Sequence, residues 1–366
     1  MRRPRAAWRH LYIGLMSGTS LDGVDAVLVD LSGARPRLLA SSYVAFGARL
    51  RRELLSLNAP AGNEIQRAAL AGNALARRYA QAVRRLLARA RRRAGAIRAI
   101  GCHGQTVRHR PELGFTLQIG NPALLAELTG IAVVADFRSR DVAAGGQGAP
   151  LAPAFHAAAF ASRKEDRAAL NLGGIANLTL LRRRAKVLGF DTGPGNCLLD
   201  LWAARHLGAR YDREGRWAAG GQVQERLLRR MLREPYFRAR PPKSTGRDLF
   251  NEAWLRCRVK GNVPSRDVQA TLLELTARSV ARYCAGVKRV IICGGGVRNQ
   301  ALMRRLSQLV APARLESSAR HGIDPQHVEA VAFAWLAMRT LEGEAGNLPA
   351  VTGARGPRVL GAVYPA

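Results

Sequence analysis

The sequence predicts an α/β protein of two lobes, and three observations carry that prediction. The chain has 366 residues, which exceeds the roughly 250–300 residues at which a single hydrophobic core stops growing. Short apolar runs typical of strands alternate with longer segments of helical spacing. A strand, a glycine-containing turn and a second strand occur near residue 14 and again near residue 173. We therefore expect two related lobes, with residues 1–161 in the first, 162–345 in the second and 346–366 as a tail.

The first half opens with the strand Tyr12–Met16, the polar turn Ser17–Gly23 and the strand Val24–Leu31. Apolar residues then recur at helical spacing between about 63 and 93, with arginines between them. The elements expected after this helix are strands at 96–100, 115–119 and 131–135, a helix that Asn121 caps with Pro122 at its first position, an irregular Gly-rich stretch at 143–149, a short helix at 153–160 and a polar linker at 162–167.

The second half repeats the opening arrangement. Ala168–Leu172 is an expected strand that meets Gly173-Gly174, and Ala176–Leu181 is the strand that follows. The next strand, 187–190, ends at Asp191. The remaining expected elements are helices at 197–207, 268–285, 299–309 and 328–341 and a strand at 290–293 that meets three glycines.

The chain is strongly basic, with a formal net charge of +32. Of its 58 basic residues 53 are arginine, spread along the sequence rather than clustered. A nucleic-acid binder usually concentrates its charge on one face. This distribution disfavours specific nucleic-acid binding as the main function, although a non-specific attraction to polyanions is expected at low salt.

The five cysteines are widely spaced and contain no C-x-x-C pair, which excludes a disulfide framework and a zinc ribbon. No apolar run approaches the ~18 residues of a membrane helix. The basic start lacks the apolar core and cleavage pattern of a secretory signal. A reducing cytoplasm is the simplest compartment.

The turn in GLMSGTSLDGVDAVLVD is the first candidate site. Its glycines and hydroxyls offer donors to an anion, and Asp22 or Asp25 could hold a hydrated Mg²⁺. It matches neither a Walker A nor a G-x-G-x-x-G pattern, which disfavours a P-loop or Rossmann mechanism. The alternative is a plain hairpin with turn-forming residues.

Three more segments carry chemistry in the second half. Gly173-Gly174 is the counterpart of the first turn, and the three glycines in IICGGGVRN would let a flat ring approach the backbone. In FDTGPGN, Asp191 follows a buried strand and could act as a general base. The alternatives are structural turns and a helix N-cap at Asp191 or Asn196.

Two polar segments of the first half are candidates for substrate contacts. In GCHGQTVRHR, His103, Gln105 and Thr106 could bind a polar substrate, whereas Cys102 is more simply a buried thiol. In DFRSRDVAAGGQGAP, Arg138, Arg140 and Asp141 could bind a carboxylate or hydroxyls. Solvated loop charges are the alternative.

Taken together, these segments resemble the anhydro-N-acetylmuramic acid kinase family. The matching stretches run in order from about residue 12 to the C-terminus and include SGTSLDG, GCHGQTVRH, NLGGIANLTLL, FDTGPGN, KSTGRDLFN and IICGGGVRN. The resemblance implies the sugar kinase/actin/Hsp70-like fold, with a ligand cleft between the lobes and a tail that packs back on the first lobe.

The resemblance also implies a site. Asp191 would be the catalytic base, which deprotonates water. Substrate contacts would come from Gln105, Thr106, Asn121, Arg138 and Glu329, and Mg²⁺ would meet Asp22. ATP would be held by Ser17, Gly18, Thr19, Ser20, Leu21, Asp22, Gly23, Val24, Gly173, Gly174, Gly193, Gly195, Gly294, Gly295 and Gly296.

The implied activity is ATP-dependent opening of 1,6-anhydro-N-acetylmuramic acid with phosphorylation of O6, in cytoplasmic recycling of cell-wall sugar. The implied partners are the sugar, ATP and a second copy of the chain, with no membrane. Two alternatives remain: another sugar phosphotransferase or nucleotide hydrolase of the same fold, and an arginine-rich nucleic-acid-binding module.

Overall fold

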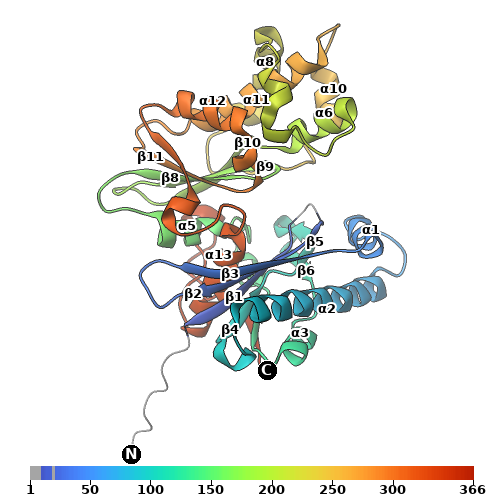
Figure 1. Ribbon diagram of the computed structural model, residues 1–366, viewed down its shortest axis with the longest axis vertical. Coiled ribbons are helices and arrows are strands. Elements are labelled where there is room, and N and C mark those ends of the chain that lie inside the picture. The colour runs from blue at the N-terminus through green and yellow to red at the C-terminus, as the bar shows by residue number, and fades with distance from the viewer. Residues whose placement is uncertain (1–9, 19–20) are drawn as a thin grey trace, which may run out of the picture. The chain divides into compact units, whose positions relative to one another are not determined.

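The structure is a computed structural model that describes residues 10–18 and 21–366. The predicted Thr19 and Ser20 of the first turn lie outside the described residues. The chain divides into two compact units (Figure 1). Unit 1 contains residues up to 159 together with 327–366, and unit 2 contains residues 160–326.

Unit 1 is built on a six-stranded sheet. Strand β1 (Leu11–Met16) pairs antiparallel with β2 (Gly23–Asp30) and parallel with β4 (Ala99–Cys102). The strand order is β13-β7-β4-β1-β2-β3. The other strands are β3 (Arg37–Ala45), β7 (Val133–Ala135) and β13 (Ala362–Tyr364), and the hairpin β5 (Gln105–Arg110) and β6 (Phe115–Ile119) forms a sheet of its own.

Two helices cover the opposite faces of this sheet (Figure 1). Helix α2 (Glu64–Ala90) packs on β2 and β3, and helix α13 (Val328–Leu341) packs on β1 and β4. The remaining helices of unit 1 are α1 (Ala48–Ser56), α3 (Pro122–Thr129), α4 (Ser139–Ala143), α5 (Ala152–Phe160, whose last residue belongs to unit 2) and α14 (Pro349–Thr352), with short 3₁₀ turns at Ala94–Ala96 and Pro111–Leu113.

Glycines in the central strands explain why α13 belongs to unit 1. A Cβ on Gly14 would lie 1.8 Å from the carbonyl oxygen of Ala330, and one on Gly101 would lie 2.0 Å from that of Phe333. Only glycine permits so close an approach of helix and sheet backbones. This differs from the expected division, which put residues 328–341 in a second lobe of 162–345. The other expected boundary was closer, since the division between 159 and 160 lies next to the expected linker.

Unit 2 repeats this sheet arrangement with five strands in the order β10-β9-β8-β11-β12. Strand β8 (Arg167–Leu172) pairs antiparallel with β9 (Ile175–Leu181) and parallel with β11 (Arg289–Cys293). The other strands are β10 (Leu188–Pro194), antiparallel to β9, and β12 (Arg314–Ser317), parallel to β11. Because β8 occupies the position that β1 has in unit 1, the predicted pair of related α/β lobes is confirmed.

The core of unit 2 lies around helix α11 (Ser265–Ala281), which contacts β9, β10 and the helices α6 (Cys197–Leu207) and α12 (Gln300–Val310). The smaller helices are α7 (Arg216–Ala219), α8 (Glu225–Leu232), α9 (Pro235–Arg238) and α10 (Glu252–Arg258), with 3₁₀ turns at Arg213–Gly215, Gly295–Arg298 and Ser318–His321.

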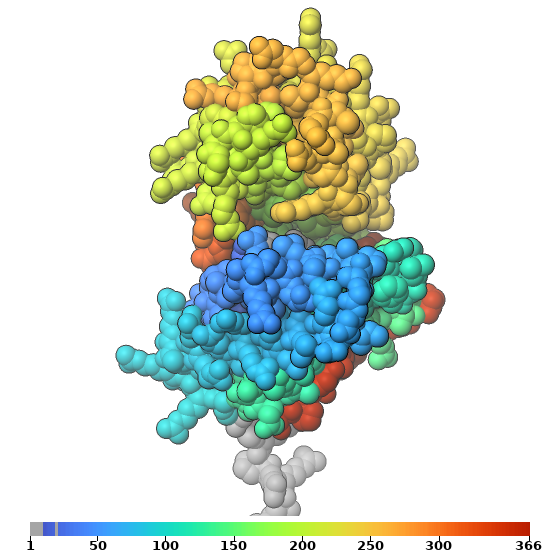
Figure 2. Space-filling model, turned by 90° about the vertical axis from the view of Figure 1, so that its right-hand side faces the viewer, coloured from blue at the N-terminus to red at the C-terminus, as the bar shows by residue number. Residues whose placement is uncertain are grey.

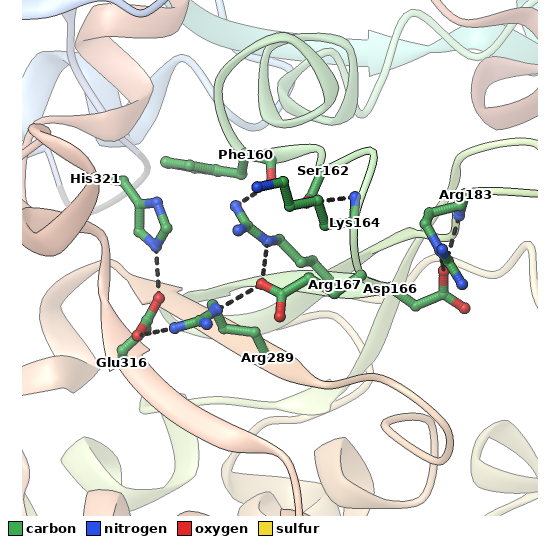
Figure 3. Close-up of polar contacts among 10 residues, drawn as sticks. Phe160, Ser162, Lys164, Asp166, Arg167, Arg183, Arg289, Glu316 and His321 are labelled. Atoms are coloured by element: carbon green, nitrogen blue, oxygen red, sulfur yellow. Dashed lines mark hydrogen bonds and ion pairs between the residues drawn. The ribbon is translucent and has the colours of Figure 1, made fainter.

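A chain of ion pairs ties three parallel strands of unit 2 together (Figure 3). Arg167 and Arg289 face each other in the register of β8 and β11, and Glu165 accepts from the Nε atoms of both, at 2.8 and 2.7 Å. Glu316 on β12 extends this network: its Oε2 accepts from Arg289 Nη1 and its Oε1 lies beside His321 Nε2, at 2.7 Å each. The carboxylates relieve the repulsion between the two guanidinium groups, so the network fixes the register of this edge.

Exposed arginines occur on both units. Helix α2 lies at the surface shown in Figure 2, and its exposed residues include Arg77, Arg84 and Arg85. In unit 2, Arg256 and Arg304 are exposed as well.

Candidate functional site

Asp191 lies in a β-bulge rather than at the end of a strand. Strand β10 continues through it to Pro194, and its register on β9 shifts between Asp191 and Gly193. The expectation that the strand ends at Asp191 was therefore wrong, because β10, an antiparallel edge strand, continues to Pro194. Bulges are frequent beside active sites, where they re-aim one side chain.

The Asp191 carboxylate is held by donors from two segments. Its Oδ1 accepts from Asn177 Nδ2 at 3.0 Å. Its Oδ2 accepts from the Thr245 amide at 3.0 Å and the Ser244 hydroxyl at 3.2 Å. Burial raises the pKa of Asp191, and these hydrogen bonds oppose the rise. The result is a positioned carboxylate that is a stronger base than an exposed one.

The backbone of Asp191 is fixed as firmly as its side chain. Its amide donates to Lys243 O at 3.0 Å, and its carbonyl accepts from the Tyr236 hydroxyl at 2.6 Å. Lys243 Nζ lies 4.3 Å from the centre of the Tyr236 ring and donates to Tyr236 O at 2.8 Å. Burial lowers the pKa of Lys243 to about 8, with Arg282 adding to the effect and Asp191 opposing it.

The glycine loop 294–296 packs against the end of β8 beside the Gly173-Gly174 turn. A Cβ on Gly294, whose φ is +84°, would lie 2.3 Å from Asn171 Oδ1, and one on Gly296 would lie 2.6 Å from Leu172 Cβ. Asn196 ties this junction by donating to the carbonyls of Leu172 and Gly173, at 3.1 and 3.0 Å. Asn196 is also the N-cap residue of α6, but its side chain makes no capping bond to the helix.

The predicted ATP-binding glycines fall into two groups. Gly173 and Gly295 have open space where a Cβ would point, apart from one distant contact at Gly173. Gly193 and Gly195 are buried, since a Cβ there would meet Phe237 at 2.7 Å and Gly173 O at 2.5 Å. The Gly195 amide also donates to Gly174 O at 2.9 Å. Gly193 and Gly195 therefore shape the turn and leave the open surface to Gly173 and Gly295.

A cavity of about 230 Å³ lies beside the three-glycine loop. Carboxylates of Asp200 and Glu214 and the guanidinium of Arg298 line it together with Gly295 and Gly296. Burial raises the pKa of Asp200 to about 6, with Arg247 and Arg210 opposing. Pockets that enclose a drug-sized ligand measure about 300–1,000 Å³, so a cavity of this size can enclose only part of a larger ligand.

In unit 1, the turn after β1 is partly committed to the fold. The buried Ser17 hydroxyl lies 2.8 Å from the Tyr79 hydroxyl and donates to Gly104 O at 3.1 Å. Leu21, Gly23 and Val24 are buried, and the Leu21 amide closes the turn on Gly18 O at 3.2 Å. Gly18 has open space around it. Of the described residues in this turn, Gly18 and Asp22 are the ones that reach the surface.

The two candidate metal ligands differ in their surroundings. Asp22 lies 3.8 Å from Arg51 and is about one-third exposed. Asp25 lies within β2, and burial raises its pKa while His327 opposes. In residues 10–18 and 21–366, no cluster of three metal-ligating side chains occurs. Mg²⁺ needs only one or two carboxylates with phosphate oxygens, so Asp22 is a suitable ligand for such an ion. Asp25 is less suitable, because burial disfavours its charged form.

Arg138 is the best-anchored of the predicted substrate residues. Its Nη1 donates to Gly148 O at 2.8 Å, and its Nε and Nη2 lie 3.2 and 3.0 Å from His103 Nε2. Burial and the Arg138 charge lower the pKa of His103 to about 3, so the ring is neutral. Its Nδ1 lies 2.9 Å from Gly104 O and must carry the proton.

Glu329 stands at the start of α13, near Arg138. The surrounding protein desolvates its carboxyl and raises its pKa, with Arg138 opposing and Asp25 adding to the rise. The side chain nevertheless keeps an exposed surface. Such a carboxyl holds its proton more readily than an exposed glutamate does.

The other three predicted substrate residues differ in availability. Gln105 is buried, and in the described part of the chain its Oε1 has no hydrogen-bond partner. Thr106 accepts from Gln118 at 3.2 Å. Asn121 caps α3 through Leu124 N and donates to Asn73, at 2.9 and 2.8 Å. Gln105 thus keeps an acceptor for a ligand, while Asn121 is committed to the fold.

Sequence reasoning assigned no role to the loop 243–247, which supplies two of the donors to Asp191. The only signal for it was the resemblance of KSTGRDLFN to the family. Asn177 was quoted with the Gly173-Gly174 turn, but its bond to Asp191 depends on the register of β9 on β10.

Glycine turns that allow close approach to the backbone and a positioned carboxylate in the same unit are compatible with a phosphotransferase built from two α/β units. The chain belongs to the anhydro-N-acetylmuramic acid kinase family, whose model matches residues 10–366.

Curated relatives agree with this assignment. The chain is 55% identical over 363 residues to the anhydro-N-acetylmuramic acid kinase of Thiobacillus denitrificans, covering 97% of both chains. It is 59% identical over 367 residues to the enzyme of that name from Bordetella petrii, covering 97% of this chain and 96% of the relative.

Solved structures give weaker likenesses. The ADPNP-bound activator of 2-hydroxyisocaproyl-CoA dehydratase from Clostridium difficile has a TM-score of 0.47 at 13% identity, covering 91% of this chain and 96% of its own. ROK hexokinase from Thermus thermophilus has a TM-score of 0.34 at 18% identity, covering 90% of this chain and 99% of its own. Among the helices of the described residues, none is both long and apolar enough to cross a membrane.

Proposed function

We propose that this chain is an anhydro-N-acetylmuramic acid kinase that uses ATP and water to convert 1,6-anhydro-N-acetylmuramic acid to N-acetylmuramic acid 6-phosphate and ADP. The observation that carries the proposal is the geometry of Asp191, in the FDTGPGN motif of a chain that matches the family from residue 10 to 366. Its two oxygens are oriented by three donors, and burial raises its pKa.

Asp191 is the general base of this reaction. It takes a proton from water, whose oxygen bonds to the anomeric carbon as the bond from that carbon to O6 breaks. The freed O6 bonds to the γ-phosphorus of ATP as the bond to the β-phosphate oxygen breaks, which releases ADP. Asn177, Ser244 and Thr245 hold the carboxylate in one orientation, so little rearrangement is needed when the proton moves.

The nucleotide is proposed to bind in unit 2. The cavity beside Gly295 and Gly296 takes the nucleoside, and the turn Gly173-Gly174 takes phosphates. Gly18 and Asp22 of unit 1 are proposed phosphate and Mg²⁺ contacts. When bound, Mg²⁺ neutralises charge on the phosphates.

The sugar contacts are proposed in unit 1. The Arg138 guanidinium binds the lactyl carboxylate of the substrate, because guanidinium and carboxylate match in charge and geometry. The unpaired Oε1 of Gln105 accepts from a sugar hydroxyl or amide, and Thr106 lies next to it. Glu329 is a proposed acceptor for a substrate hydroxyl. Asn121 is proposed to act through the position of α3.

The biological setting is proposed to be cytoplasmic recycling of cell-wall sugar. All five cysteines are free thiols, as is usual in a reducing compartment. Because exposed arginines occur on both units, we propose no specific nucleic-acid partner. The homodimer stays a prediction.

The test is ADP release from ATP and Mg²⁺ with 1,6-anhydro-N-acetylmuramic acid, with the sugar product analysed by mass. A product that has gained both water and a phosphoryl group supports the proposal. Phosphorylation of another sugar but not this one would refute the substrate assignment and favour another kinase of the same fold.

A further inference from the structure

The loop Lys243–Arg247 connects the two parts of the unit 2 site. Its first half holds Asp191, through Lys243 O, the Ser244 hydroxyl and the Thr245 amide. Its last residue lies over the turn Gly173-Gly174. A Cβ placed on Gly174 would be 3.5 Å from Nη2 of Arg247 and 3.7 Å from its Nε.

Arg247 approaches this turn with its donors unused. Among the described residues, it has no hydrogen-bond or ion-pair partner, although its charge acts on Asp200 and Cys197 across the same turn. By contrast, Arg258 is paired with Glu234 and Arg305 with Glu274. A guanidinium beside a glycine turn offers paired donors in the geometry of phosphate oxygens.

A second group in the loop is unsatisfied. The Thr245 hydroxyl is buried and has no hydrogen-bond partner in the described structure. Buried polar groups are almost always paired, so an unpaired one in a native structure needs an explanation. The buried Thr245 hydroxyl and the exposed Arg247 guanidinium thus lie within three residues of one loop, both open to a ligand.

We propose that Arg247 binds the phosphates of the nucleotide at the Gly173-Gly174 turn, and that the loop Lys243–Arg247 thereby couples nucleotide binding to the position of Asp191. This rests on the proposed function, and it adds a phosphate-contacting side chain that the glycine turns lack. Phosphate draws Arg247 onto the turn, which orders the loop and fixes the Ser244 and Thr245 donors on the Asp191 carboxylate.

The first test is a series of binding measurements by calorimetry with AMP, ADP and a non-hydrolysable ATP analogue. Arg247→Gln should weaken the binding of the ATP analogue and of ADP about tenfold or more, because charge-assisted bonds to phosphate are lost. The affinity for AMP should change little. Arg247→Lys should recover part of the loss, since it keeps the charge without the paired donors. Equal weakening of all three nucleotides, or none, would overturn the phosphate contact.

The matched control is Arg256→Gln, which removes the same charge from an exposed position on α10 in the same unit. It should bind all three nucleotides as the unaltered chain does. If Arg256→Gln weakens binding as much as Arg247→Gln, the effect is the general loss of positive charge and the proposal fails.

The second test follows the coupling by hydrogen exchange of the amides at 243–247. The ATP analogue should increase protection of these amides, including the Thr245 amide that donates to Asp191, in the unaltered chain but not in Arg247→Gln. Protection that rises equally in both would show that Arg247 does not order the loop.

Steady-state kinetics separate this inference from the proposed function. With the anhydro sugar, Arg247→Gln should lower kcat/KM for ATP by about 10²-fold. If the unaltered chain does not phosphorylate the sugar, the proposed function fails, but the nucleotide series still decides the role of Arg247.

Discussion

Asp191 of unit 2 and Glu329 of unit 1 are both desolvated carboxyls, yet the chain holds them differently. Asp191 accepts three hydrogen bonds that stabilise its charged form. Glu329 makes no hydrogen bond within the described residues; the charge of Arg138 favours its ionisation and that of Asp25 opposes it. The comparison indicates that Asp191 is fixed as an oriented base, while the charge of Glu329 can change with its ligand.

Asp191→Asn should give the largest effect that this comparison predicts. The amide keeps the size of the side chain but cannot take a proton, so kcat should fall by about 10²–10⁴-fold. The measurement is ADP release with the anhydro sugar, alongside calorimetry with the ATP analogue. A variant that binds the analogue normally but turns over at more than a tenth of the original rate would remove Asp191 from the role of base.

Asn177→Ala should have the next largest effect. It removes the 3.0 Å bond to Asp191 Oδ1 and leaves the carboxylate itself intact. Because a hydrogen bond to a charged group contributes about 1.5–3 kcal/mol, kcat should fall about tenfold or more. The KM for ATP should stay the same. A rise in that KM with unchanged kcat would mean that Asn177 serves the nucleotide instead of orienting Asp191.

The titration of Lys243 should give a smaller effect, on the pH dependence of activity. Its pKa of about 8 means that the ammonium over the Tyr236 ring loses its charge as pH rises above 8, which weakens the anchor of the loop that holds Asp191. We expect kcat/KM to fall about two- to fivefold between pH 7 and 9.

Lys243→Arg keeps the charge over this range and should flatten the profile, whereas Lys243→Met should be low at all pH values. The same fall in the Arg variant as in the unaltered chain would assign the titration to another group.

Glu329→Gln should give the smallest effect, on stability. Because the pKa of Glu329 is raised in the folded state, folding favours the neutral carboxyl, and stability is lost as pH rises through the folded pKa. Gln cannot ionise, so the variant should melt above the unaltered chain at pH 7–8.

The difference in Tm should vanish near pH 3, below the ordinary glutamate pKa of about 4.3, where both side chains are neutral in the folded and unfolded states. A variant less stable at pH 7 would show that the carboxylate form is favoured in the fold.

Much of the fold follows from local pattern. The strand–turn–strand units and the helix Val328–Leu341 were predicted within a residue or two, because apolar spacing and glycine placement are local properties. Strand β3 was missed because it is an edge strand with mixed exposure. The short helices α7–α10 were missed because their residues pack around α11 instead of following one long apolar stripe.

The sequence indicated which segments contribute to the candidate site, but not which residues contact one another there. Asp191 and the glycine turns were singled out from the sequence as candidates, and their role in a site stays a prediction. The bulge at Asp191 and the orientation of Asn177 depend on pairing between β9 and β10, and the loop 243–247 reaches Asp191 from more than 50 residues away. Four residues belong to the predicted site motifs, but packing and hydrogen bonds give them a structural role: Gly193, Gly195, Ser17 and Asn121.

The central claim is that Asp191 directs water to the anomeric carbon while O6 receives the phosphoryl group. The most direct measurement is turnover in ¹⁸O-labelled water, with rapid borohydride reduction to stop exchange at the anomeric carbon, followed by mass analysis of the fragments. The account predicts one label on the anomeric carbon and none in the phosphate, with Asp191→Asn forming no labelled product. Label in the phosphate, or equal labelling by Asp191→Asn, would contradict it.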